Sequence, residues 1–171
     1  MNYLNNTDLK TVKILNKSEY PSKSAAKDKL ISNVETLVKD LDLKDGAVIS
    51  FHHHLRNGDK VLNTIMKEIQ RLGTKDITLV ASSLFPVHAE IIPLLQDGTI
   101  LNIVASYISG DLGKAISYGE LKGNLIMQSH GGRARSILNE DIVIDVAFIA
   151  SPSADKFGNI SGVNGLNSCG S

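Results

Sequence analysis

The chain has 171 residues, of which 42% are hydrophobic and 21% charged, so it can bury one continuous core. Eighteen basic residues balance eighteen acidic ones, which disfavours a nucleic-acid or anionic-membrane partner. The single cysteine, Cys169, excludes an internal disulfide framework. Because the amino-terminal segment also lacks an apolar signal core or membrane span, we expect a cytoplasmic protein.

The first predicted element is an extended arm over residues 1–22, which are polar and include Pro21. The rest, 23–171, is expected to form one α/β domain that opens with a helix over 24–41, where apolar residues recur at helical spacing. Short apolar runs then predict strands at 47–51, 76–81, 100–105, 124–128 and 145–150. Helical patterns lie between them at 59–72, 87–96, 111–120 and 132–138. This alternation favours a mostly parallel sheet with helices on both faces.

A serine stands at the end of every predicted strand or directly after it. In parallel sheets of this kind, ligands bind at the carboxyl ends of the strands. The serines at these ends are Ser50, Ser82 or Ser83, Ser106, Ser129 and Ser151. For any single one of them, capping of the following helix is the favoured explanation. Their recurrence at all five ends predicts one crevice lined with short hydrogen-bonding groups.

Three consecutive histidines, His52, His53 and His54, follow the first strand. Imidazole suits zinc, but the sequence has neither an HExxH motif nor a cysteine pair, so we expect no metal. Neutral imidazoles would instead hydrogen-bond carbonyl or carboxylate oxygens. His52 and His54 would lie on the same side of an extended segment, which makes them candidates for stabilising an oxyanion. A solvated strand end is the alternative.

The segment SHGGRAR, residues 129–135, is the second candidate. Gly131 and Gly132 let the backbone approach a ligand closely, just before a predicted helix start that directs amides at anions. Arg133 is nearer this loop than Arg135 and is the predicted anion-binding charge. Glycines that serve only a turn, beside a surface arginine, are the alternative.

Several familiar motifs are absent from the sequence. The stretch SGDLGKAIS at 109–117 has too few residues between its glycines for a Walker A loop, and no GxGxxG follows the first strand. No GxSxG elbow occurs, so the serines are not predicted to be hydrolase nucleophiles. Nucleotide hydrolysis and NAD binding are therefore disfavoured.

Long ordered strings in the sequence resemble the alpha subunits of citrate lyase, within the CoA-transferase group. They include GAVISFHHHLRNGD from residue 46, ASYISGDLGKAIS from 105, QSHGGRARSI from 128 and the terminal SCGS. The resemblance implies a Rossmann-like sheet of the type shared by CoA transferases and certain sugar-phosphate isomerases.

The reaction that the resemblance implies is acyl exchange. The acetyl thioester on the CoA-like, phosphopantetheine-type arm of an acyl carrier protein reacts with citrate, releases acetate and leaves a citryl thioester, which a second subunit cleaves. The implied partners are the acyl-carrier (gamma) and lyase (beta) subunits, and no cofactor is bound directly by this chain. The exchange is expected to pass through a mixed anhydride without a glutamate nucleophile, and no Glu stands at a predicted strand end. Citrate and citramalate both stay open as the acceptor.

The expected site combines the two candidate loops, with His52 and His54 as oxyanion stabilisers. Substrate contacts are expected from His53, Ser82, Ser83, Ser106, His130, Gly131, Gly132 and Arg133. Because the family continues past SCGS into a second domain, we expect a chain truncated at its carboxyl end that self-associates or recruits other lyase subunits. Two alternatives stay open: a non-catalytic binding or assembly fragment, and a sugar-phosphate isomerase, for which these loops offer no obvious Lys or Glu base.

Overall fold

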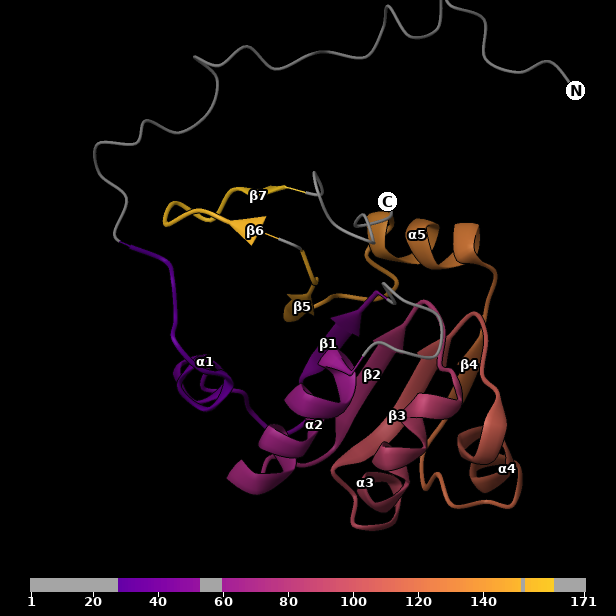
Figure 1. Ribbon diagram of the computed structural model, residues 1–171. Helices are drawn as coiled ribbons and strands as arrows, with labels where there is room; N and C mark the ends of the chain where they lie inside the picture. The colour runs from indigo at the N-terminus through magenta and orange to yellow at the C-terminus, as the bar shows by residue number, and fades with distance from the viewer. Residues whose placement is uncertain (1–27, 53–59, 152, 162–171) are drawn as a thin grey trace, which may run out of the picture. The chain divides into compact units, whose positions relative to one another are not determined.

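The structure is a computed structural model that describes residues 28–52, 60–151 and 153–161 (Figure 1). The predicted arm at 1–22, His53, His54 and Cys169 lie outside these ranges. The described chain falls into two compact units: residues 28–30 and the segment Asp155–Asn159 belong to the smaller one, and the sheet to the larger. Among the described residues, no helix combines the length and apolar character needed to cross a bilayer.

Five parallel strands form the sheet of the larger unit. They are β1 (Val48–Phe51), β2 (Ile77–Ala81), β3 (Ile100–Ala105), β4 (Leu125–Met127) and β5 (Val146–Phe148). Each lies within its predicted window and every pair is parallel, so the predicted sheet is confirmed. The order is β4-β3-β2-β1-β5. Strands β1 to β4 are added one after another on the same side, and β5 then pairs with the other side of β1. The topological switch point therefore lies between β1 and β5.

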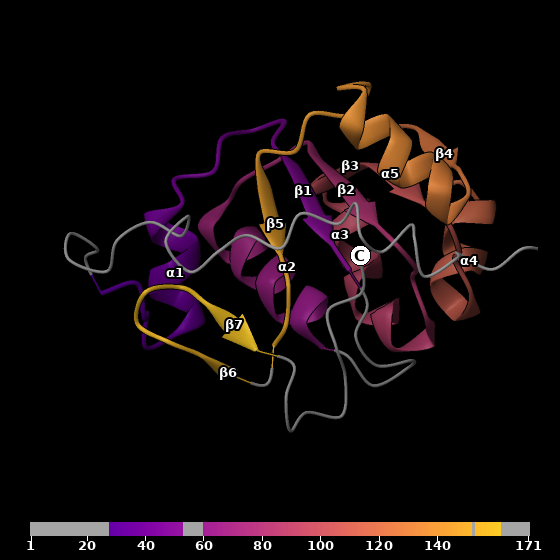
Figure 2. The same ribbon diagram turned by 90° about the horizontal axis from the view of Figure 1, so that it is seen from above.

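One face of this sheet carries the hydrophobic core. Because side chains alternate along a strand, Ile49, Leu79 and Ile103 stand side by side on that face, and all three are fully buried. They share a cluster with apolar side chains of the neighbouring helices α1 (Val34–Asp40), α2 (Val61–Leu72), η4 (Pro86–Ile91, a 3-10 helix), α3 (Ile92–Gln96) and α4 (Gly110–Ser117). Figure 2 looks down on the strand ends, where α5 (His130–Leu138) lies apart from α1 and α2.

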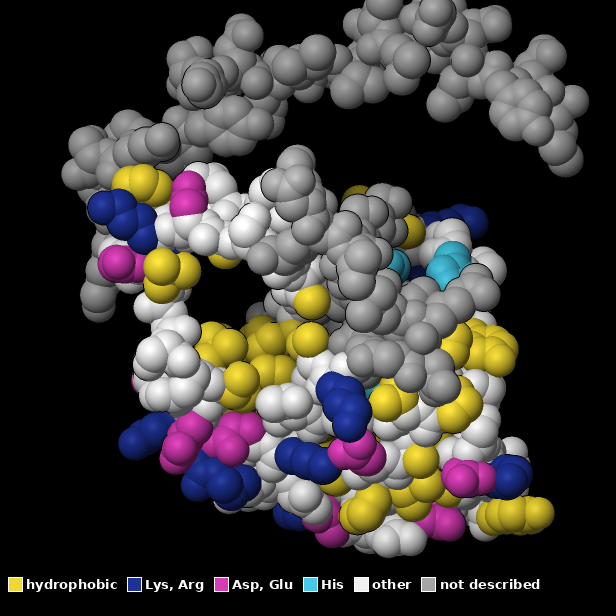
Figure 3. Space-filling view, in the orientation of Figure 1, with side chains coloured by type: hydrophobic (Ala, Val, Ile, Leu, Met, Phe, Trp, Pro, Cys, Tyr) yellow, Lys and Arg dark blue, Asp and Glu magenta, His cyan; other side chains and the backbone are white. Residues whose placement is uncertain are grey.

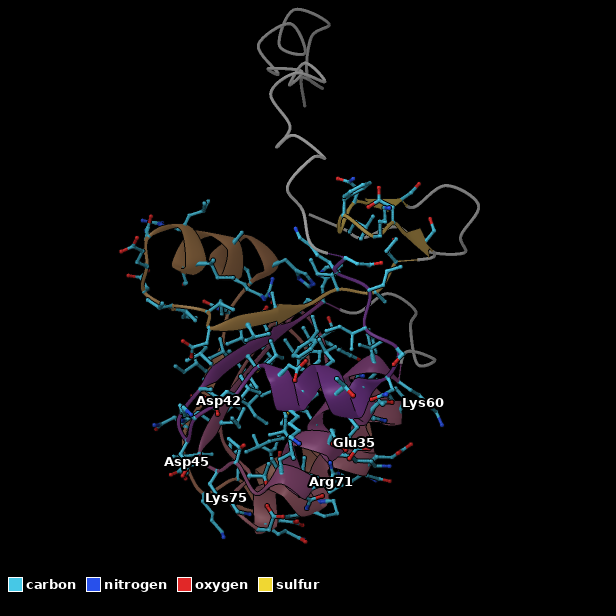
Figure 4. All side chains as sticks on the ribbon, turned by 90° about the vertical axis from the view of Figure 1, so that its left-hand side faces the viewer. Glu35, Asp42, Asp45, Lys60, Arg71 and Lys75 are labelled. Carbon is cyan, nitrogen blue, oxygen red and sulfur yellow. The ribbon has the colours of Figure 1, made fainter. Side chains whose placement is uncertain are left out.

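Helices α1 and α2 are joined at the surface by Arg71. Its Nη2 donates to Glu68, one turn earlier, at 2.6 Å and to Glu35 of α1 at 2.9 Å, and Glu35 and Arg71 are labelled in Figure 4. The hydrogen bond from Arg71 lowers the pKa of Glu68. Exposed pairs of this kind add little stability, so the buried cluster determines the packing. Charges of both signs are intermixed on the face drawn in Figure 3, in keeping with the balanced composition.

The first helix begins later than predicted. It spans Val34–Asp40 rather than 24–41, because Asn33 is extended and its side chain accepts a hydrogen bond from the Thr36 amide at 2.8 Å. An N-cap of this kind fixes where a helix starts. Leu30, counted in the predicted apolar stripe, is consequently 60% exposed. The prediction was therefore wrong for residues 28–33.

Other boundaries also differ from the predicted ones. The predicted helix at 87–96 is divided into η4 and α3. Residues 153–161, expected to be loop, contain a hairpin in which β6 (Ser153–Ala154) pairs antiparallel with β7 (Ile160–Ser161). The Asp155 carboxylate builds the turn by accepting hydrogen bonds from the amides of Phe157 and Asn159, at 2.8 and 3.0 Å.

We predict that the core face, and not the exposed end of α5, determines stability. Leu79→Ala removes a fully buried side chain and should lower the free energy of unfolding by about 2–5 kcal/mol. Leu138→Ala, the same change at a side chain that is 83% exposed, should alter it by less than about 0.5 kcal/mol. Urea denaturation measures both variants, and equal losses would contradict the described packing.

Candidate functional site

A row of polar residues crosses the carboxyl edge of the sheet. Phe51, Ala81, Ala105 and Met127 are register partners at the ends of four adjacent strands. The residues that follow them are His52, Ser82, Ser106 and Gln128. Two backbone hydrogen bonds extend the pairing into this row, from Ser82 N to Phe51 O at 3.2 Å and from Gln128 N to Ala105 O at 3.1 Å. The sheet therefore places in one row side chains that are up to 76 positions apart in the sequence. Ser82 and Ser106 lie in this row, as predicted from the serines at the strand ends.

Helix α5 is linked to this edge through Arg133. Its Nη2 donates a hydrogen bond of 2.6 Å to Oγ of Ser50, a buried residue of β1. Ser50 alternates with the core-facing Ile49 and Phe51, so α5 reaches the face of the sheet opposite the core. This contact links α5 to the side of β1 that faces away from the core.

Arg133 has no carboxylate partner among the described residues. Its Nε is buried and makes no hydrogen bond within them, and burial lowers the pKa of Arg133 from its ordinary value. A guanidinium nevertheless stays charged at neutral pH. Arg71 shows the contrast, because it is exposed and paired with two glutamates. Burying a cation without a counter-ion is energetically unfavourable, so an anion beside the half-buried Arg133 would be favourable.

The start of α5 adds backbone donors beside Arg133. Ser129 is the N-cap, and its Oγ accepts a hydrogen bond from the Gly132 amide at 2.9 Å. The helix therefore begins at His130, two residues before the predicted start, and Gly131 and Gly132 lie in its first turn instead of in a loop. First-turn amides of a helix that are not used by the cap point at anions.

The two glycines differ in their surroundings. A Cβ at Gly132 would lie 3.1 Å from Ser129 Oγ and 3.5 Å from Gln128 Cβ, so a larger residue there would press on the Ser129 cap. A Cβ at Gly131 would have no atom within 4 Å. No described neighbour therefore explains Gly131, which leaves the helical backbone open to close approach from outside.

The remaining predicted residues have varied positions. Ser82 and Ser83 are buried, the Ser106 hydroxyl oxygen is buried without a hydrogen bond to any described residue, and His52 is half-buried. His130 is exposed, while Ser151 donates its hydroxyl to the carbonyls of Ser153 and Ser161 in the hairpin and is thereby used structurally. His53 and His54 lie outside the described residues. Within the described ranges, no group of three His, Cys, Asp or Glu side chains is arranged to hold a metal ion.

Sequence reasoning missed two residues at this edge. They are Gln128, which lies beside Ser106, and Ser136, which contacts Gln128. The Ser136 hydroxyl donates a hydrogen bond to Gln128 Oε1 at 3.0 Å. The Nε2 of Gln128 is buried and has no described partner. A signal did exist for Ser136, since positions three apart on a helix share a face and Arg133 is three residues earlier.

We predict opposite responses of stability to alanine at the two glycines. Gly131→Ala should raise the free energy of unfolding by about 0.5–1 kcal/mol, because a helical glycine is replaced with no steric conflict. Gly132→Ala should show no such gain, because the new methyl group presses on the Ser129 cap. Chemical denaturation measures both, and a destabilised Gly131→Ala variant would contradict the open surroundings of that position.

Known proteins match this chain in both sequence and fold. The family model of the citrate lyase alpha subunit (CitF) matches residues 27–171. The citrate lyase alpha chain of Haemophilus influenzae is 40% identical over 155 residues, which cover 91% of this chain and 31% of that protein. The corresponding chain of Escherichia coli K12 is 38% identical over 155 residues, with 91% and 30% covered.

A solved structure extends the match to three dimensions. It is described as the alpha subunit of citrate lyase in complex with citrate, from Streptococcus mutans, and it superposes with a TM-score of 0.81 at 44% identity. The match covers 88% of this chain and 29% of that one, so the chain spans less than a third of the length of these relatives. The family match over most of the sequence shows that this chain belongs to the citrate lyase alpha subunit family.

Proposed function

We propose that this chain contributes the acceptor site of a citrate CoA-transferase, the acyl-exchange activity of citrate lyase. The reaction converts an acetyl thioester of the carrier protein and citrate into a citryl thioester and acetate. The observation that carries the proposal is Arg133, a half-buried guanidinium that has no carboxylate partner among the described residues and lies at the carboxyl edge of the sheet. The citrate named in the Streptococcus mutans structure supports this choice of ligand.

The guanidinium of Arg133 is suited to one carboxylate of citrate. Nη2 donates one hydrogen to Ser50, and the hydrogen of Nε meets no described acceptor, so the guanidinium keeps unused N–H donors. Two parallel N–H donors match the two oxygens of a carboxylate. Ser50 therefore holds the arginine in place while its other donors bind the substrate.

The chemistry requires stabilisation of negative charge on oxygen. Attack by a citrate carboxylate on the thioester carbonyl develops an oxyanion, and collapse expels the carrier thiolate and forms a mixed anhydride. The thiolate then attacks the citryl carbonyl and releases acetate, so one thioester is exchanged for another. The amides of His130 and Gly131 in the first turn of α5 and the imidazoles of His52 and His54 are the proposed donors to the oxyanion, an effect worth a few kcal/mol.

The partners follow from the same proposal. The acyl-carrier (gamma) subunit would deliver the thioester on its CoA-like arm, and the lyase (beta) subunit would consume the citryl product. Self-association is also proposed, because the apolar side chains of edge strand β4, Leu125, Ile126 and Met127, are 41–52% exposed. A binding fragment without turnover would bind citrate but fail in acetyl transfer, and an isomerase would convert ribose 5-phosphate instead.

We predict that Arg133→Ala weakens citrate binding by roughly 2–5 kcal/mol, the usual loss when a charged partner is removed from a desolvated pair. Arg135→Ala is the matched control, because Arg135 is exposed on the same helix two residues further on. Isothermal titration calorimetry with citrate measures both variants. Equal affinities of the two variants would remove Arg133 from the acceptor site.

For the histidines we expect a change in turnover without a change in affinity. Replacing His54 by alanine should lower the acetyl-transfer rate roughly a hundredfold and leave citrate affinity nearly intact, the pattern of a contact made only in the transition state. His52→Ala and the double variant test whether the two share this role. Steady-state acetyl-transfer assays decide: unchanged turnover in all three variants would leave the backbone amides of α5 as the only proposed donors.

A further inference from the structure

A second buried donor lies at the same edge as Arg133. Gln128 directly follows β4, and its backbone N–H is held by Ala105 O at 3.1 Å, beside Ser106. Its side chain runs toward α5: a Cβ added at Gly132 would lie 3.5 Å from Gln128 Cβ and 3.9 Å from Oε1, both ordinary contact distances. The partly buried side chain of Gln128 therefore bridges the end of the sheet and α5.

The orientation of the Gln128 carboxamide is fixed from α5. Ser136 donates its hydroxyl hydrogen to Oε1 at 3.0 Å, so the oxygen of the amide is used and the nitrogen is directed away from Ser136. Nε2 carries two hydrogens and is buried, and no described residue accepts either of them. A buried donor without an acceptor is unfavourable, and holding one in a fixed direction is typical of a binding site.

The two α5 residues that contact the ends of the strands lie on one face of the helix. Arg133 and Ser136 are three residues apart in α5 and so point to the same side of the helix. Arg133 reaches Ser50 at the end of β1, and Ser136 reaches Gln128 at the end of β4. The Nε of Arg133, the Nε2 of Gln128 and the Oγ of Ser106, all at the carboxyl ends of the strands, are buried and have no hydrogen-bond partner among the described residues. Two of the three are obligatory donors, which calls for a ligand rich in acceptor oxygens.

We infer that Gln128 is a specificity residue whose Nε2 donates to a second oxygen group of citrate, and that Ser136 is the positioning residue that aims it. This inference rests on the proposed function, in which Arg133 binds the first carboxylate. A monocarboxylate such as acetate satisfies Arg133 alone, whereas citrate satisfies both donors. Gln128 thereby favours the acceptor substrate over rebinding of the acetate product, without adding a second positive charge.

The direct test follows the Gln128 carboxamide by NMR while citrate is added to the isotopically labelled wild-type chain. Its side-chain NH2 signals, identified by their loss in Gln128→Met, should shift with the same midpoint as the backbone amides of residues 130–133. In Ser136→Ala the shift should be smaller at saturating citrate. Because the wild-type chain is observed, the result does not depend on whether a variant folds.

Affinity measurements complete the test. Gln128→Met should weaken citrate binding about tenfold, the equivalent of one hydrogen bond at 1.4 kcal/mol per factor of ten, and leave acetate binding unchanged. Gln96→Met is the matched control, since Gln96 ends α3 and precedes β3, at the opposite edge of the sheet. The inference is overturned if citrate shifts the amides of 130–133 but not the Gln128 NH2 signals. It is also overturned if the two Met variants bind citrate with equal affinity. In either case the proposed function stands. If citrate shifts no signal in the wild-type chain, both are overturned.

Discussion

The hydrogen bond between Arg133 and Ser50 is the interaction on which the candidate site depends. It joins residues that are 83 positions apart and connects α5 to strand β1, with 2.6 Å between Arg133 Nη2 and Ser50 Oγ. None of the side chains of α5 is fully buried, so the helix is not anchored by an apolar face of its own. Polar contacts, from Arg133 to Ser50 and from Ser136 to Gln128, therefore link the helix to the ends of the strands. The contact with Ser50 keeps the Arg133 guanidinium at the carboxyl ends of the strands, and no described carboxylate is paired with it there.

The topology of the sheet gives this contact its functional meaning. Strand β1 is the point at which the order reverses, with β2 on one side and β5 on the other. Ligands of open parallel sheets bind beyond the carboxyl ends of the strands at such a point. Ser50 belongs to β1, and Ser106 and Gln128 follow β3 and β4 at the same edge. The core lies on the opposite face, so polar groups near Ser50 do not interrupt it.

Most of the fold was predictable because its signals are local and repeated. The strands are short apolar runs buried in a parallel sheet, and β3 was predicted with its observed limits, Ile100–Ala105. Helix starts were predicted less well, since they depend on single caps: Asn33 shortened α1, and Ser129 moved the start of α5 to His130. The resemblance to citrate lyase alpha subunits is confirmed by the family match. The hairpin at 153–161 was missed because its strands are only two residues long.

The candidate site was predictable in part. Arg133 was distinguished from Arg135 by its nearness to the loop, and the structure gives only Arg133 the contact with Ser50. Gln128 was not predictable, because a glutamine after a strand resembles any solvated loop residue until its partner Ser136, eight positions later, is brought to it by the fold. The roles of His52 and His54 stay predictions, since they concern the transition state.

The most direct measurement of the central claim is a crystal structure of this chain with citrate bound. The account predicts a citrate carboxylate within hydrogen-bond distance of Nε and Nη2 of Arg133, while Nη2 keeps its contact with Ser50. Citrate bound elsewhere, with the Arg133 guanidinium still held by Ser50 alone, would contradict it.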